Sequence, residues 1–92
     1  MTDYVTRVEL HNEQKDDYPK LHAEMDLRGF GRTIWIEGKH YHMPHATYLS
    51  NGALSSKDVY DLAQAAVTAI GRKGGVVVTA SAGIWGGGLR LI

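Results

Sequence analysis

The sequence predicts a single α+β domain in which two strand–helix–strand units follow each other. Alternating apolar and polar residues indicate strands over residues 4–10, 32–37, 41–50 and 76–79. Apolar residues at helical spacing indicate helices over residues 16–28 and 56–70. The order βαββαβ is that of the ferredoxin-like fold, an antiparallel sheet with two helices on one face. The other face of the sheet is then free to meet a partner.

The length of 92 residues corresponds to one domain. We assign residues 1–80 to the ferredoxin-like domain and residues 81–92 to an apolar, Gly-rich C-terminal extension. The chain contains no cysteine, which excludes disulfides, thiolate metal sites and a cysteine nucleophile. The extension is predicted either to fold onto the domain or to act as an arm exchanged with a second subunit.

The first strand and first helix have clear apolar faces. In the strand, the alternating set of four residues that begins at Tyr4 and ends at Leu10 is the predicted core face. In the helix, apolar and aromatic side chains recur at i, i+3, i+4 and i+7 from Tyr18 to Met25. Asp16 or Asp17 can cap the start of this helix. The helix is expected to end at a left-handed Gly29, with Phe30 folding back on Met25.

The second and third strands are expected to form a hairpin with its turn at Gly38-Lys39. If Ile34 and Ile36 point towards the helices, Trp35 lies on the open sheet face. Pro44 interrupts the third strand, which is therefore expected to be bent, bulged or at an edge of the sheet.

The second helix has the firmest local signals. Ser55 and Asp58 stand at the spacing of a capping box. Gly71 and the pair Gly74-Gly75 are expected to end the helix and turn the chain into the last strand.

Charge is unevenly distributed although the net charge is zero. Residues 1–27 carry seven acidic and three basic side chains, a net charge of −4, and residues 28–92 carry three acidic and seven basic side chains. Such asymmetry is consistent with an anionic partner, but also with an acidic first helix and scattered bases. No leader opens the chain, and no apolar run approaches the roughly 20 residues that span a bilayer. We expect a cytoplasmic protein with no membrane partner.

Histidines are the densest functional residue type around the predicted hairpin. His40 and His42 share one face of a strand and are the candidates for general acid and base in RNA cleavage. No carboxylate adjoins them at a typical ligand spacing, so we expect neither a metal nor another cofactor. His22 lies on the apolar stripe of a helix and is read as a core-edge residue. Pro44 redirects His45 away from the pair.

Arg7, Arg32 and Trp35 are candidates for binding single-stranded RNA, by aromatic stacking and by contacts to phosphate. Tyr41 joins them if the third strand presents it on the same side. The alternative is that the same sheet face, with Trp35, is buried in a homodimer.

Several core, cap and turn positions carry a family resemblance: Tyr4-Val5, Asp17-Tyr18, Leu21, Met25, Gly29-Phe30, Ile34, Gly38, Met43-Pro44 and Tyr48. Over about residues 4–50 the chain resembles the small antitoxin family called GhoS. The resemblance implies a ferredoxin-like endoribonuclease that cleaves the messenger RNA of a membrane-acting toxin. The histidine-rich hairpin and the Gly-Trp-Gly tail depart from that family.

Two functions are therefore predicted. The first is an antitoxin-like protein that binds single-stranded RNA and, if it is an enzyme, cleaves it without a metal. The alternative is a non-enzymatic bacterial or phage protein that inhibits a protein partner, such as a defence nuclease. In either case we expect a homodimer formed through the sheet face or the C-terminal tail.

Overall fold

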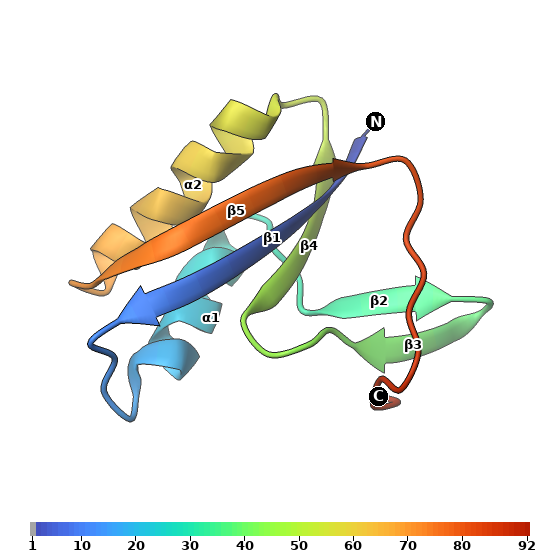
Figure 1. Cartoon of the computed structure of the whole chain (residues 1–92), viewed down its shortest axis with the longest axis horizontal. Helices are drawn as coiled ribbons and strands as arrows, with labels where there is room; N and C mark the ends of the chain where they lie inside the picture. The colour runs from blue at the N-terminus through green and yellow to red at the C-terminus, as the bar shows by residue number, and fades with distance from the viewer. Residues whose placement is uncertain (1) are drawn as a thin grey trace.

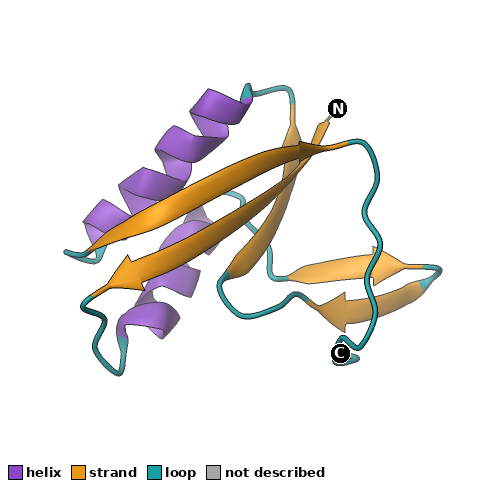
Figure 2. Ribbon diagram, viewed as in Figure 1, coloured by secondary structure: helices purple, strands orange, loops and turns teal. Residues whose placement is uncertain are grey.

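The main sheet of the computed structural model, which describes residues 2–92, has three antiparallel strands in the order β4-β1-β5. Two helices cover one face of this sheet, and the remaining two strands form a separate hairpin beside it (Figures 1 and 2). In chain order the elements are β1 (Thr2–His11), α1 (Asp17–Leu27), β2 (Thr33–Ile36), β3 (Lys39–His42), β4 (Thr47–Gly52), α2 (Ser56–Ala69) and β5 (Lys73–Ser81). The predicted α+β architecture, with two helices and antiparallel sheets, is confirmed.

The strand predicted over residues 41–50 is divided into β3 and β4, which corrects the expectation of one four-stranded sheet. Pro44 cannot donate to a ladder, and its carbonyl accepts the backbone N–H of Thr47 at 3.1 Å, so the chain turns here. Ala46 adopts a positive φ of 56°, which also breaks the extended run. The β2–β3 hairpin consequently leaves the main sheet. Gly31, just before β2, still bridges to Leu49 of β4, through two backbone hydrogen bonds of 2.8 Å.

The hairpin turn lies one residue earlier than predicted. Its two central residues are Glu37 and Gly38, with φ values of 49° and 78°. Positive φ at both positions is characteristic of a type I′ turn, whose twist matches that of the flanking strands. Glycine tolerates this conformation, whereas glutamate adopts it under strain.

The core lies between the main sheet and the two helices. The even-numbered face of β1 is buried there, as predicted, including Tyr4, Val8 and Leu10. Helix α1 contributes Leu21 and Met25 to the same cluster. Helix α2 contributes a stripe of small apolar side chains that allows close approach to the sheet: Val59, Ala63, Ala66 and Val67.

The predicted ending of α1 is confirmed. Gly29 has a φ of 87°, and the N–H of Phe30 donates to the carbonyl of Met25 at 3.1 Å, as in a Schellman motif. The predicted cap at the other end is not formed, because Asp16 makes no side-chain cap hydrogen bond. The buried Asp17 carboxylate instead accepts the N–H of Gln14 at 2.6 Å and the Nε–H of Arg72 at 2.7 Å, which ties α1 to the start of β5.

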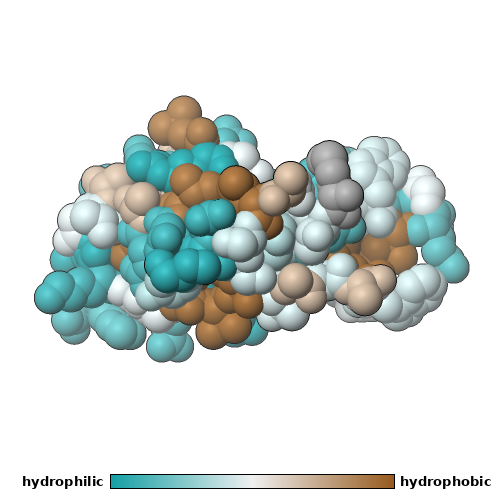
Figure 3. Space-filling view, turned by 90° about the horizontal axis from the view of Figure 1, so that it is seen from above, coloured by the Kyte–Doolittle hydropathy of each residue, from teal (hydrophilic) through white to brown (hydrophobic). Residues whose placement is uncertain are grey.

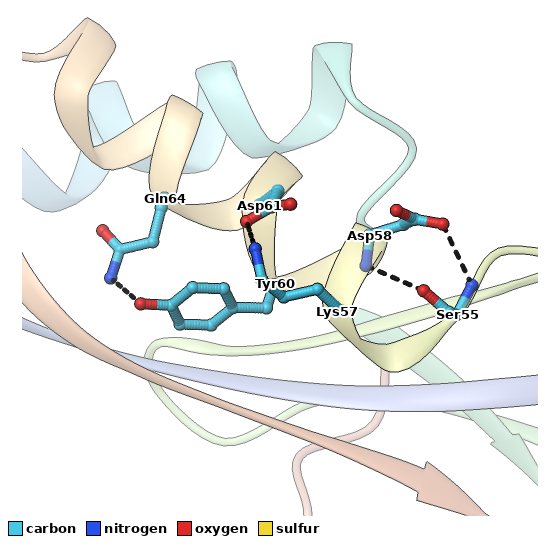
Figure 4. A network of polar contacts seen from close by, with 6 residues as sticks. All are labelled: Ser55, Lys57, Asp58, Tyr60, Asp61 and Gln64. Atoms are coloured by element: carbon cyan, nitrogen blue, oxygen red, sulfur yellow. Dashed lines mark hydrogen bonds and ion pairs between the residues drawn. The ribbon is translucent and has the colours of Figure 1, made fainter.

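Helix α2 begins with the predicted capping box (Figure 4). The N–H of Asp58 donates to the Ser55 hydroxyl at 3.1 Å, and the N–H of Ser55 donates to the Asp58 carboxylate at 3.4 Å. Gly71, with a φ of 75°, ends the helix as expected. Gly74-Gly75 does not form a turn, because both residues lie within β5 and pair with β1.

Candidate functional site

The β2–β3 hairpin brings together three of the predicted site residues. Trp35 pairs with His40 across the two strands, and their rings are stacked with centroids 4.3 Å apart and planes 2° apart. His42 pairs with Thr33, which places it on the same face as His40. The Trp35 side chain is 67% exposed, so this face presents an aromatic surface to solvent.

The structure separates Tyr41 and Arg7 from this surface. Tyr41 pairs with Ile34, on the hairpin face opposite Trp35. Ile34 does not point towards the helices: with Val5, it lines an apolar hollow on the helix-free side of the main sheet. Trp35 was expected on the open sheet face if Ile34 pointed towards the helices. That condition is not met. Arg7 is exposed in β1, between Thr47 of β4 and Val77 of β5.

A second cluster of ionisable rings, which the sequence reasoning did not assemble, lies between α1 and the start of β4. Tyr18 and His22 project from successive turns of α1, and His45 comes from the segment that links β3 to β4. The His45 ring centroid is 4.5 Å from that of Tyr18 and 6.3 Å from that of His22. Tyr48 of β4 completes the cluster, with its ring centroid 5.7 Å from that of His22. We call these four residues the His–Tyr cluster.

The His22 ring is fixed by a hydrogen bond of 2.7 Å between its Nδ1 and the hydroxyl of the buried Tyr48. Burial, with smaller contributions from the charges of Arg32 and His45, lowers the pKa of His22 from 6.5 to about 4. Burial likewise raises the pKa of the Tyr48 hydroxyl. At neutral pH, His22 is therefore an uncharged imidazole held by a protonated phenol.

One residue of the cluster, His22, faces a hollow beside α1, whose lining does not include Tyr18, His45 or Tyr48. His22 lines this hollow together with Arg32, whose guanidinium is one of the predicted phosphate-binding groups. Asp26 and Phe30 form part of the same wall. A ligand that entered the hollow would meet the Arg32 cation, the neutral His22 imidazole and the Asp26 carboxylate.

Sequence reasoning missed the cluster because its members look like core residues when read singly. Tyr18 and His22 stand four positions apart on the apolar stripe of α1, and that i,i+4 spacing is the one signal that relates them. Nothing in the sequence relates them to His45. The turn after Pro44, with its positive φ at Ala46, carries the His45 ring back onto α1.

Within residues 2–92, no three His, Cys, Asp or Glu side chains gather closely enough to hold a metal ion. In the same part of the chain, neither helix is long and apolar enough to cross a membrane. No family model matches the chain, and no curated protein or solved structure is significantly similar to it. Any functional assignment therefore rests on the residues and their geometry.

Proposed function

We propose that this protein is an antitoxin-like endoribonuclease that binds single-stranded RNA and cleaves it without a metal ion. The observation that carries the proposal is that His22 and Arg32 line one hollow, while the ring centroid of a second imidazole, His45, lies 6.3 Å from that of His22. Metal-independent RNA cleavage needs a base, an acid and a cation for the phosphate, and these groups supply all three.

In the proposed reaction, His22 is the base. The mechanism uses the tautomer in which His22 Nδ1–H donates to the Tyr48 hydroxyl; Nε2 then carries the free lone pair and takes the proton from the ribose 2′-OH. The 2′-oxygen attacks phosphorus, the bond from phosphorus to the 5′-oxygen breaks, and a 2′,3′-cyclic phosphate forms. Protonated His45 gives a proton to the leaving 5′-oxygen, and Arg32 neutralises charge on the phosphate.

The hairpin supplies a surface for the bases. A base that stacks on an exposed aromatic ring gains about 1–3 kcal/mol regardless of its identity, which suits single-stranded RNA. Trp35, held flat against His40, is such a ring. His40 and His42 are the second candidates for proton transfer, because they share a face of β3. The His–Tyr cluster is favoured over them for two reasons. Arg32 lines the same hollow as His22, and the hydrogen bond to Tyr48 fixes the His22 ring.

A ferredoxin-like relationship is part of the proposal. The order β4-β1-β5, with the two helices on one face, matches three strands of that fold. In the ferredoxin-like fold, a fourth strand pairs with the outer edge of the strand that corresponds to β4. The Gly31–Leu49 bridge lies at this position. We infer that the fourth strand has been reduced to this bridge and that the rest of it forms β2 of the hairpin.

Cleavage of a fluorescent single-stranded RNA, measured with and without EDTA, tests the function. Replacing the general acid in His45→Gln should slow cleavage by about 100-fold or more, since acid–base groups contribute that much. The matched control is His11→Gln, an exposed histidine at the end of β1. Cleavage by His45→Gln at the wild-type rate, with loss of cleavage in His40→Gln or His42→Gln, would transfer the chemistry to the hairpin.

Binding is measured separately, by fluorescence anisotropy at several salt concentrations. Trp35→Ala should weaken binding about 10-fold, the equivalent of about 1.4 kcal/mol of lost stacking. Loss of cleavage on addition of EDTA would refute the metal-independent mechanism. A protein that neither binds nor cleaves RNA would instead fit the non-enzymatic binding function.

A further inference from the structure

Residues 90–92 dock on the outer edge of β3 through an isolated β-bridge. Leu91 bridges to Tyr41, the N–H of His42 donates to the carbonyl of Arg90 at 2.8 Å, and the N–H of Ile92 donates to the carbonyl of His40 at 3.1 Å. The tail thus bridges to the edge of the two-stranded hairpin, and Figure 1 shows it running there from the end of β5.

The segment that connects β5 to this bridge is loosely held. Among residues 2–92, no backbone–backbone hydrogen bond involves residues 84–89. A hollow lies on each side of the segment: one is lined by Ile36 and Tyr41, the other by Val5 and Ile34. Gly86, Gly87 and Gly88 give the segment conformational freedom. Eight residues, 82–89, can span up to about 26 Å when extended.

Docking within one chain leaves the apolar side chains of the tail uncovered. Trp85 is 75% exposed, Leu91 60% and Ile92 61%. They belong to the end of the molecule where the hairpin and tail lie, and Figure 3 shows apolar colour at that end. An apolar strip of this kind, carried on a flexible segment, calls for a covering surface.

We propose that this surface is a second copy of the chain, and that two copies exchange their tails, residues 82–92. The exchanged tail makes the same contacts with β3 of its partner that it makes in one chain, so those contacts are kept. Among the described residues, no backbone–backbone hydrogen bond of residues 84–89 has to break. Exchange brings two hairpins and two tails together around the symmetry axis, where Trp85 and its apolar neighbours are covered.

The absence of cysteine from the natural chain allows a direct test. Tyr41 and Leu91 form a non-hydrogen-bonded antiparallel pair, because the hydrogen bonds join the residues on either side of them. The Cα atoms of such a pair are about 4.5 Å apart, within the range that a disulfide spans. Cysteines at these positions can therefore report which chain's tail occupies β3.

The single variants Tyr41→Cys and Leu91→Cys are refolded together, oxidised mildly and run on a non-reducing gel. Exchange predicts a covalent heterodimer, and the control mixture of Leu91→Cys with Lys57→Cys, on the exposed surface of α2, should give none. The double variant Tyr41→Cys/Leu91→Cys should form covalent dimers. An internal disulfide in a monomeric double variant would overturn the proposal.

The mass of the unmodified protein provides a second readout that does not depend on any variant folding. Light scattering should give twice the chain mass of 10.1 kDa. Truncation after Ser81 should give a monomer. A wild-type protein that is monomeric at all concentrations up to the millimolar range would overturn the proposal, as would a dimer that survives the truncation.

Discussion

Between pH 6.5 and about 4, acid should destabilise this protein through His22, and the size of the effect follows from its environment. Burial lowers the pKa of His22 from 6.5 to about 4 in the folded state. Between these two pH values the unfolded chain binds a proton at this position and the folded chain does not. The free energy of unfolding therefore falls as the pH falls through this window and levels off below about 4.

The magnitude can be worked out at pH 5. A full shift from 6.5 to about 4 would lower the free energy of unfolding by about 2 kcal/mol at that pH. Because the side chain is only half-buried, solvent screening reduces this to about 1 kcal/mol. For a domain of this size, a loss of 1 kcal/mol lowers the Tm by roughly 4–8 °C.

Urea denaturation of the wild type and of His22→Gln between pH 4 and 8 measures the effect. The substitution should remove most of the slope between pH 6.5 and 4. His11→Gln, at the exposed end of β1, should keep it. NMR titration of the His22 ring protons provides the direct measurement. A His22 ring that titrates near 6.5, or an unchanged slope in His22→Gln, would refute the account of the His–Tyr cluster.

Three further substitutions test the fold. Gly74→Ala places a Cβ 2.6 Å from a carbonyl oxygen of β1 and should destabilise by about 1–3 kcal/mol in thermal melts, whereas Gly75→Ala, with nothing within 4 Å, should be nearly neutral. Glu37→Asn should raise the Tm, because asparagine accepts the positive φ of the type I′ turn at a lower cost, about 0.5–1 kcal/mol; an unchanged or lower Tm contradicts this. The pKa of Asp17 is lowered, mainly by the backbone hydrogen bond from Gln14. Its carboxylate therefore stabilises the fold at pH values above its ordinary pKa of 3.8. This stabilisation is lost as the pH falls through the lowered pKa. Asp17→Asn should lose stability at pH 7 and little more in acid, whereas Asp16→Asn should behave as wild type; equal effects of the two would contradict the buried ion pair.

Cleavage should also depend on pH in a way that follows from His22. Its pKa of about 4 keeps the proposed base deprotonated throughout the neutral range, so the acid limb of the rate profile should lie near pH 4. An acid limb near 6.5 would assign the base to another histidine.

Local structure was predictable wherever it depends on neighbours in the sequence. The buried alternation of β1, the capping box of Ser55 and Asp58, and the Schellman ending at Gly29 each involve residues within a few positions of one another. One local prediction failed because of a tertiary contact. Gly74 resembles a turn residue but lies in β5, where only glycine fits against a carbonyl of β1.

The candidate site shows the same division. The shared face of Trp35, His40 and His42 follows from strand alternation and from hairpin pairing, so the sequence could predict it. The His–Tyr cluster joins α1 to residues more than twenty positions away, and its existence depends on how the chain turns after Pro44.

By itself the sequence determined the two helices and their glycine endings, the capping box of α2 and the buried face of β1, because these depend on periodicity and on local hydrogen bonds. Only the tertiary structure decided that the hairpin leaves the main sheet, that the tail docks on β3, and that His45 meets His22. Those outcomes depend on long-range contacts, whose cost and gain are set by the packing of the whole chain and not by any one segment.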